Sequence, residues 1–144
     1  MLVSQILKSK GSQGVVTVKP GTLVSEAAKI LAEKRIGTVV VSETGTSLEG
    51  ILSERDIVRE LGQRGAGCMS EKVDDYMTTA LVTCSMSDDA VEVLEKMTEG
   101  RFRHMPVTDG DKMVGLITIG DAVKARLSEL AMEKNALEGM IMGH

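Results

Sequence analysis

Aromatic side chains are nearly absent from this 144-residue sequence, which has no Trp and only Tyr76 and Phe102 as aromatic residues. Proteins that bind single-stranded nucleic acid usually stack its bases on aromatic rings along a positively charged groove. The formal charge here is -4, and the densest cationic cluster is Arg101, Arg103 and His104, so a long phosphate backbone is repelled. We therefore expect no nucleic-acid partner, whereas a single nucleotide needs only local positive charge.

Cysteine and long apolar runs are scarce as well. Cys68 and Cys84 are too few and too far apart for a disulfide framework or a zinc knuckle, which predicts reduced thiols and no metal site. No apolar run approaches the roughly 20 residues of a membrane span, and the N-terminal segment lacks a signal-peptide core. We expect a cytoplasmic protein that does not enter a membrane.

The sequence contains two copies of one unit. Thr17 aligns with Thr83 at an offset of 66, and Gly50 aligns with Gly115 at an offset of 65, as if a turn had lost one residue. The apolar pairs that share the first offset at helical spacing are Val24 with Ala90, Ala27 with Val93, Ala28 with Leu94 and Leu31 with Met97. The chain is therefore predicted to be an internal duplication.

Each copy has the pattern strand, helix, strand, strand, helix, which predicts a mixed α/β fold of the α+β class. In the first copy the predicted elements are 15–18, 24–34, 38–41, 48–52 and 53–61; in the second they are 81–84, 88–99, 104–107, 113–117 and 121–136. The predicted organisation is a lead-in helix and loop (1–14), repeat 1 (15–61), a linker with a second lead-in helix (62–79), repeat 2 (80–136) and a C-terminal tail (137–144).

A hydroxyl residue followed by an Asp three positions later marks the start of the last helix in each copy. These pairs are Ser53 with Asp56 and Thr118 with Asp121. One interpretation is a capping box, in which the two side chains satisfy free amide groups at the helix start. The other is a ligand site, because a helix N-terminus favours phosphate and an Asp can accept from both hydroxyls of a ribose. The repetition of the pair favours a ligand, and an Asp can serve both roles.

With the sequence RHMPVTDGDKMVGLIT in the second copy, these repeated motifs resemble a tandem pair of CBS domains, the stand-alone Bateman module. The resemblance runs from about Val3 to Ala136. It implies that the two β-α-β-β-α repeats pack as a pseudo-two-fold pair with clefts that bind AMP, ADP, ATP, NAD-type dinucleotides or S-adenosylmethionine. It also implies a homodimer, formed through the long helices.

The resemblance further implies which residues line each cleft. The favoured cleft would join the first helix start to strands of the second copy, through Ser53, Asp56, Val82, Thr83, Arg103, His104 and Met105. The weaker cleft would use Val16, Thr17, Gly37, Thr38, Val39, Thr118 and Asp121. It lacks cationic side chains, and Val40 stands where the second copy has the typical Pro106.

An enzyme would need a nucleophile with a base, a metal cluster or paired carboxylates in a pocket, and no such constellation is evident here. We therefore expect no catalysis and no catalytic cofactor. The predicted function is a regulatory module that binds an adenine nucleotide and acts in trans on an unknown protein target. The alternative is a dimerisation or scaffold module that works without a ligand.

Overall fold

The computed structural model describes residues 1–11 and 14–141, and the chain divides into two compact units. We call residues 14–81 with 109–114 the first-repeat unit, and residues 1–11, 82–108 and 115–141 the second-repeat unit. Residues 12, 13 and 142–144, which belong to the predicted N-terminal loop and C-terminal tail, lie outside the described residues. The predicted repeat boundaries remain a prediction.

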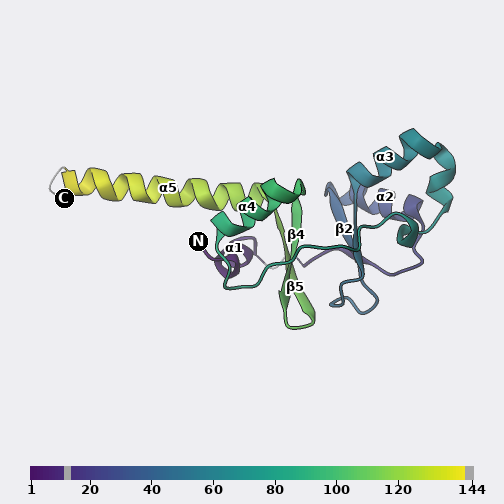
Figure 1. Ribbon diagram of the computed structural model, residues 1–144, viewed down its shortest axis with the longest axis horizontal. Helices are drawn as coiled ribbons and strands as arrows, with labels where there is room; N and C mark the ends of the chain where they lie inside the picture. Colours follow the sequence, from purple (N-terminus) through teal and green to yellow (C-terminus); the bar gives the residue numbers. More distant parts are fainter. Residues whose placement is uncertain (12–13, 142–144) are drawn as a thin grey trace. The chain divides into compact units, whose positions relative to one another are not determined.

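The first-repeat unit contains a three-stranded sheet of order β1–β2–β3, formed by β1 (Thr17–Val18), β2 (Thr38–Val41) and β3 (Gly50–Ser53). β1 is parallel to β2, and β3 is antiparallel to it. Two helices, α2 (Val24–Lys34) and α3 (Glu54–Arg64), lie on one side of β2 (Figure 1). The apolar side chains of α2 face the sheet at helical spacing, as the sequence predicts.

The end of α3 differs from the prediction. The helix does not stop before Gly62 but runs to Arg64, and Gly65 follows it with a φ of 77°. A glycine inside a helix costs only about 1 kcal/mol, so a helix can continue through it when the neighbouring residues favour helix. The ion pair from Arg64 to Glu60 at 2.9 Å holds that last turn.

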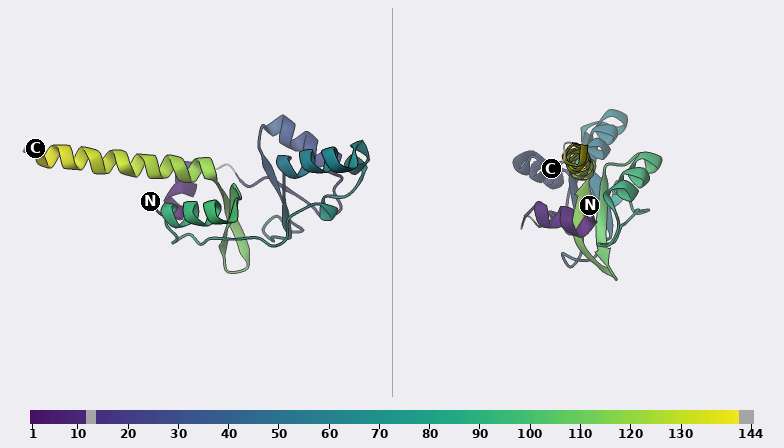
Figure 2. Two further views of the ribbon diagram at one scale, coloured as in Figure 1. Left: turned by 45° about the horizontal axis from the view of Figure 1, so that its top comes forward. Right: turned by 90° about the vertical axis from the view of Figure 1, so that its left-hand side faces the viewer.

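The second-repeat unit contains the hairpin of β4 (His104–Asp109) and β5 (Lys112–Thr118), whose tip belongs to the first-repeat unit. Three helices, α1 (Val3–Ser9), α4 (Ala90–Gly100) and the start of α5 (Ile119–Ile141), lie together in it (Figure 2). The predicted end of α5 at Ala136 is wrong, because the helix continues to Ile141. Nothing in that stretch stops a helix except Gly139, which lies close to the observed end.

The predicted strand at residues 81–84 is reduced to a single bridge between Cys84 and Val107. In the first repeat, the carbonyl groups at and just before β1 accept two hydrogen bonds. The Val40 amide donates to the Val16 carbonyl, and the Ser42 amide donates to the Val18 carbonyl. In the second repeat only the second of these bonds has a counterpart, because Pro106 stands in place of Val40 and has no N–H. The proline therefore removes one hydrogen bond of the ladder, and two bonds remain, from Cys84 to Pro106 and from Thr108 to Cys84.

The lead-in segments are exchanged between the repeats. α1, which precedes the first repeat, packs into the core of the second-repeat unit through Val3 and Ile6. Val73, which precedes the second repeat, packs into the core of the first-repeat unit. This second lead-in is not the predicted α-helix but two short 3₁₀ turns, η1 (Ala66–Ser70) and η2 (Val73–Asp75). Each unit is therefore built from segments that are distant in the sequence.

Two equivalent glycines make room for these exchanged segments. A Cβ atom on Gly50 would lie 2.7 Å from Met77 Cγ and 3.1 Å from the carbonyl oxygen of Thr78, which also bridges to Ile51. A Cβ atom on Gly115 would lie 2.7 Å from a methyl carbon of Leu7. The glycine pair identified as a repeat signature thus marks the place where each lead-in touches its sheet.

Candidate functional site

The first hydroxyl and carboxylate pair caps α3 in the first-repeat unit. Ser53 is the N-cap residue, and its Oγ accepts a hydrogen bond from the Asp56 amide at 3.2 Å. In return, Asp56 Oδ2 accepts from the Ser53 amide and from the Ser53 hydroxyl, both at 2.9 Å. The predicted capping box is confirmed, and it brings a hydroxyl and a nearly buried carboxylate together at a helix N-terminus.

The other oxygen of Asp56 has a cationic partner from the same helix. Arg59 donates to Asp56 Oδ1 at 2.9 Å, and its side chain is 54% exposed. The arginine is therefore the exposed member of this ion pair, whereas the Asp56 side chain is only 12% exposed. A ligand hydroxyl that displaced Arg59 would meet Oδ1, while the cap bonds to Oδ2 stay in place.

The second pair caps α5 in the second-repeat unit in the same way. Thr118 Oγ1 accepts from the Asp121 amide at 3.1 Å, and Asp121 Oδ2 accepts from the Thr118 amide at 2.9 Å. Unlike Asp56, Asp121 is also bound from a distant segment: Lys10, directly after α1, donates to its Oδ2 at 2.7 Å and to the carbonyl oxygen of Leu116 at 2.9 Å.

The charge of Lys10 sets the electrostatics of this second cap. Burial by itself raises the pKa of Asp121, but the hydrogen bonds from Lys10 and Thr118 outweigh it and hold the pKa below its ordinary value. The sequence analysis missed Lys10, because it lies 111 residues from Asp121 and only the docking of α1 on the second repeat brings it there. The second Asp is therefore already held by a lysine.

The predicted base and phosphate contacts of the favoured cleft lie in the second-repeat unit. The side chains of Val82 and Arg103 are exposed, whereas that of Met105 is fully buried in the core. Met105 can therefore offer a ligand only its main chain. His104 and Thr83 are partly buried. The pairing of these residues with Ser53 and Asp56, which belong to the other unit, remains a prediction.

The main chain near Val82 differs from its counterpart in a way that concerns binding. In the first repeat, the Val40 amide donates to the Val16 carbonyl at 3.0 Å. The corresponding pair in the second repeat is Pro106 and Val82, and a proline cannot donate. The Val82 carbonyl, beside an exposed side chain, can thus accept a hydrogen bond from another donor.

The predicted strand residues of the weaker cleft lie in the first-repeat unit and are less accessible. Thr38 and Val39 are buried in β2, and Thr17 is partly buried and pairs with Val40 in the parallel ladder. Val16 is partly buried, as is Gly37. The predicted partners of these residues, Thr118 and Asp121, belong to the second-repeat unit, so this pairing also remains a prediction.

Within each unit, the residue just before the second strand of a repeat forms a main-chain hydrogen bond with the start of the last helix. The Glu54 amide donates to the carbonyl oxygen of Gly37 at 2.9 Å, and the Ile119 amide donates to that of Arg103 at 2.8 Å. The capped helix starts and the loop residues predicted for binding are therefore neighbours. In the second repeat the residue at this position is the cationic Arg103, and in the first it is Gly37.

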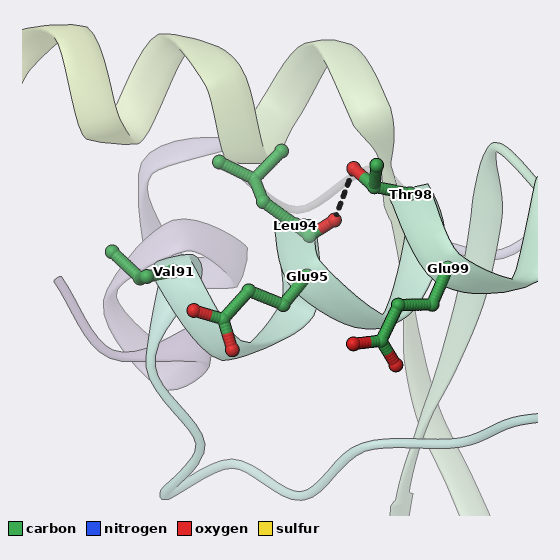
Figure 3. Close-up of a pocket in the computed structure, with 5 residues that line it drawn as sticks. All are labelled: Val91, Leu94, Glu95, Thr98 and Glu99. Carbon is green, nitrogen blue, oxygen red and sulfur yellow. Dashed lines mark hydrogen bonds between the residues drawn. The ribbon is translucent and has the colours of Figure 1, made fainter.

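A shallow hollow on α4 contains none of the predicted site residues. It is lined by Val91, Leu94, Glu95, Thr98 and Glu99, with the Thr98 hydroxyl donating to the Leu94 carbonyl (Figure 3). Its two glutamates would repel a phosphate. Their side chains point to the same side of the helix (Figure 3), so this hollow is a poor nucleotide site.

In the described part of the chain, the cysteine thiols and acidic side chains form neither a reactive thiol site nor a metal site. Both cysteines are buried, and burial raises the pKa of Cys84 to about 11, which keeps its thiol protonated. Across residues 1–11 and 14–141, no group of three or more His, Cys, Asp or Glu side chains is arranged to hold a metal ion. None of the described helices has the length and apolar character to cross a membrane.

Comparison with known proteins covers both repeats. The CBS domain family matches residues 3–63 and 73–128. A curated relative, the mitochondrial CBS domain-containing protein CBSX3 of Arabidopsis thaliana, is 32% identical over 98% of this chain and 72% of its own length.

Two solved structures extend this similarity to the fold. The CBS-domain protein ATU1752 of Agrobacterium tumefaciens has a TM-score of 0.83 and 40% identity, covering 88% of this chain and 99% of its own. The CBS domain protein PAE2072 of Pyrobaculum aerophilum, solved in complex with AMP, has a TM-score of 0.78 and 26% identity, covering 92% of this chain and 99% of its own.

Proposed function

We propose that this chain, which belongs to the CBS domain family and carries two copies of the domain, is a non-catalytic sensor of an adenine nucleotide. The ligand is AMP, ADP, ATP or an NAD-type dinucleotide, with S-adenosylmethionine a weaker candidate. The similar Pyrobaculum protein was solved with AMP, which supports an adenine ligand in this chain. The favoured site is the cleft formed by Ser53, Asp56, Val82, Thr83, Arg103, His104 and Met105.

The observation that carries this proposal is the carbonyl of Val82, to which Pro106 of the neighbouring strand cannot donate. Adenine presents an amino group that donates hydrogen bonds, and a main-chain acceptor beside apolar side chains suits it where no aromatic ring can stack. In the first repeat the equivalent carbonyl of Val16 is already bound by Val40. This difference favours base binding at the second repeat.

The ribose and phosphate contacts follow from the capped helix and the cationic strand start. Asp56 would accept from the ribose hydroxyls in place of Arg59, and Arg103 with His104 would face the phosphate. A charge-assisted hydrogen bond from an arginine contributes about 1.5–3 kcal/mol, enough to matter for affinity. The weaker cleft offers Asp121, but Lys10 already holds that carboxylate at 2.7 Å.

Regulation would act in trans from a homodimer in the cytoplasm. A ligand changes such an equilibrium only by binding one arrangement of the protein better than another. The proposed output is therefore a change in packing that a separate protein target senses.

A thermal-shift panel of AMP, ADP, ATP, NAD, NADH and S-adenosylmethionine tests the proposal. An excess of a hundred times Kd should stabilise the protein by about 2.7 kcal/mol. Asp56→Ala should abolish the shift. Asp121→Ala removes the corresponding carboxylate of the weaker cleft, together with its ion pair to Lys10, and should keep the shift because the ligand is proposed to bind in the favoured cleft. Loss of the shift in both variants, or no shift in the wild type, contradicts the favoured site.

A dimerisation or scaffold module that needs no ligand is a second candidate. The exposed apolar side chains along α5, including Leu127 and Leu137, favour it. A scaffold should ignore all six compounds in the panel while keeping its oligomeric mass.

A further inference from the structure

The second half of α5 buries no side chain in its own unit, although the Met1 amino group forms an ion pair with Glu129 at 2.6 Å. α5 spans 23 residues, but its buried side chains are Ala122 and Ala125, both in the first two turns. From Leu127 to Ile141 no residue of this described helix is buried, and Figure 1 shows this part running past α1 and α4. Most of the stability of a helix in a protein comes from the packing of an apolar face, and the apolar side chains of this segment have no such packing within the unit. A projecting segment of this length therefore calls for a partner.

The exposed apolar side chains of this segment follow a heptad pattern. We define the α5 stripe as the residues spaced alternately by four and three: Val123, Leu127, Leu130, Lys134, Leu137 and Ile141. Its apolar members are 42–83% exposed. This spacing places them on one seam of the helix, as the a and d positions of a coiled coil are placed, and a single Lys at an a position is a known determinant of register. The seam fits another helix of the same kind.

The charges beside the stripe favour an antiparallel pair with a second copy. In a parallel pair, Lys134 would face the partner's Lys134, and Glu133 would face the partner's Glu138. In an antiparallel pair, Lys134 packs beside the partner's Leu130, and Lys124 faces the partner's Glu138. The one remaining like-charged contact is between the two Glu133 side chains. In either arrangement Glu133 also has Arg126 at 3.7 Å on its own helix, and Glu138 has Lys134 at 3.9 Å. Opposite charges therefore meet only in the antiparallel arrangement.

We propose that the α5 stripe binds the α5 stripe of a second copy as a short antiparallel coiled coil. This deepens the homodimer part of the proposed function, since it names the surface and the direction of the contact. It does not depend on nucleotide binding, which involves other residues.

Light scattering of the full chain tests the interface. The wild type is expected at the dimer mass, and Leu137→Glu at the monomer mass, because a charge in the seam cannot be buried. Met132→Glu is the matched control: it alters an equally exposed residue of the same helix, 60% against 59%, but off the stripe, so it should stay dimeric. A monomeric wild type, or a Leu137→Glu variant that remains dimeric, overturns the proposal.

The nucleotide panel separates this proposal from the sensor function. Leu137→Glu should lose the dimer mass while keeping any thermal shift that the wild type shows with nucleotide. A folded far-ultraviolet spectrum for Leu137→Glu confirms that the mass change is not unfolding.

Charge exchange tests the direction of the pair. Glu138→Lys should weaken the dimer about tenfold at low salt, since it faces the partner's Lys124, and adding Lys124→Glu should restore it. A parallel pair gives the opposite result, because Glu138→Lys would then relieve the repulsion from the partner's Glu133 and tighten the dimer. Tightening, or no restoration in the double variant, overturns the antiparallel arrangement.

Discussion

The two repeats share a backbone plan, yet they differ where a nucleotide would bind. In the first repeat, Val40 completes a parallel ladder with Val16, and the loop before β2 carries Gly37. In the second, Pro106 leaves the Val82 carbonyl without that strand partner, and the loop carries Arg103. The two copies thus share one backbone plan, but only in the second does the carbonyl lack this donor from the neighbouring strand and the loop before the strand carry Arg103.

The helix caps show a second difference between the copies. Asp56 is bound by Arg59 from its own helix, whereas Asp121 is bound by Lys10 from a segment that precedes the first repeat. The first ion pair is local to α3, whereas the second ties the segment after α1 to the start of α5. Equivalent carboxylates can therefore serve binding in one copy and cohesion in the other.

The largest expected effect concerns the glycines under the exchanged lead-ins. Gly50→Ala should lower the free energy of unfolding by about 2–3 kcal/mol, because the added methyl meets both Met77 and the Thr78 main chain. Gly115→Ala should cost about 1 kcal/mol, since only the flexible end of Leu7 must move. Urea denaturation of the two variants measures the loss of unfolding free energy in each. Equal losses would contradict the prediction that the contact with the Thr78 main chain makes the Gly50 substitution more costly.

An intermediate effect is expected at the open strand. Pro106→Val supplies an N–H that can close on the Val82 carbonyl, so nucleotide affinity measured by calorimetry should fall about tenfold, as for the loss of one hydrogen bond. The converse control, Val40→Pro, removes the bond to Val16 and should lower stability by about 1–3 kcal/mol without changing that affinity. Unchanged affinity in Pro106→Val would refute the role of Val82.

The smallest effect is expected at Lys10. The pKa of Asp121 is lowered in the folded protein, so its ionised form adds stability above its ordinary pKa, and this contribution is lost as the pH falls through the lowered value. In Lys10→Met only the Thr118 hydrogen bonds still oppose burial, so the pKa of Asp121 rises and acid unfolding should begin at a higher pH. At neutral pH the cost should be about 1 kcal/mol.

The exposed Lys8 provides the control for this prediction, because Lys8→Met removes a charge from the same helix without touching Asp121. Acid titration followed by circular dichroism compares the variants. Identical midpoints for Lys10→Met and Lys8→Met would show that the ion pair does not set the acid response.

The sequence by itself determined the duplication, the mixed α/β fold and the capped helix starts. These features are encoded locally: α2 begins and ends where its apolar spacing predicts, and Ser53 with Asp56 forms the reciprocal bonds that their separation of three residues allows. The family and the fold class were confirmed for the same reason, since both depend on short motifs that occur twice.

Only the tertiary structure decided what distant segments do to these local features. The exchange of lead-ins brings Lys10 to Asp121 and Leu7 to Gly115. The residues next to these positions in the sequence give no indication of either contact. The projecting end of α5 was missed because a helix end without a strong stop signal depends on what packs against it. Local hydrogen bonds and apolar spacing depend on residues close in the sequence, whereas these contacts form only when distant segments pack together in the folded protein.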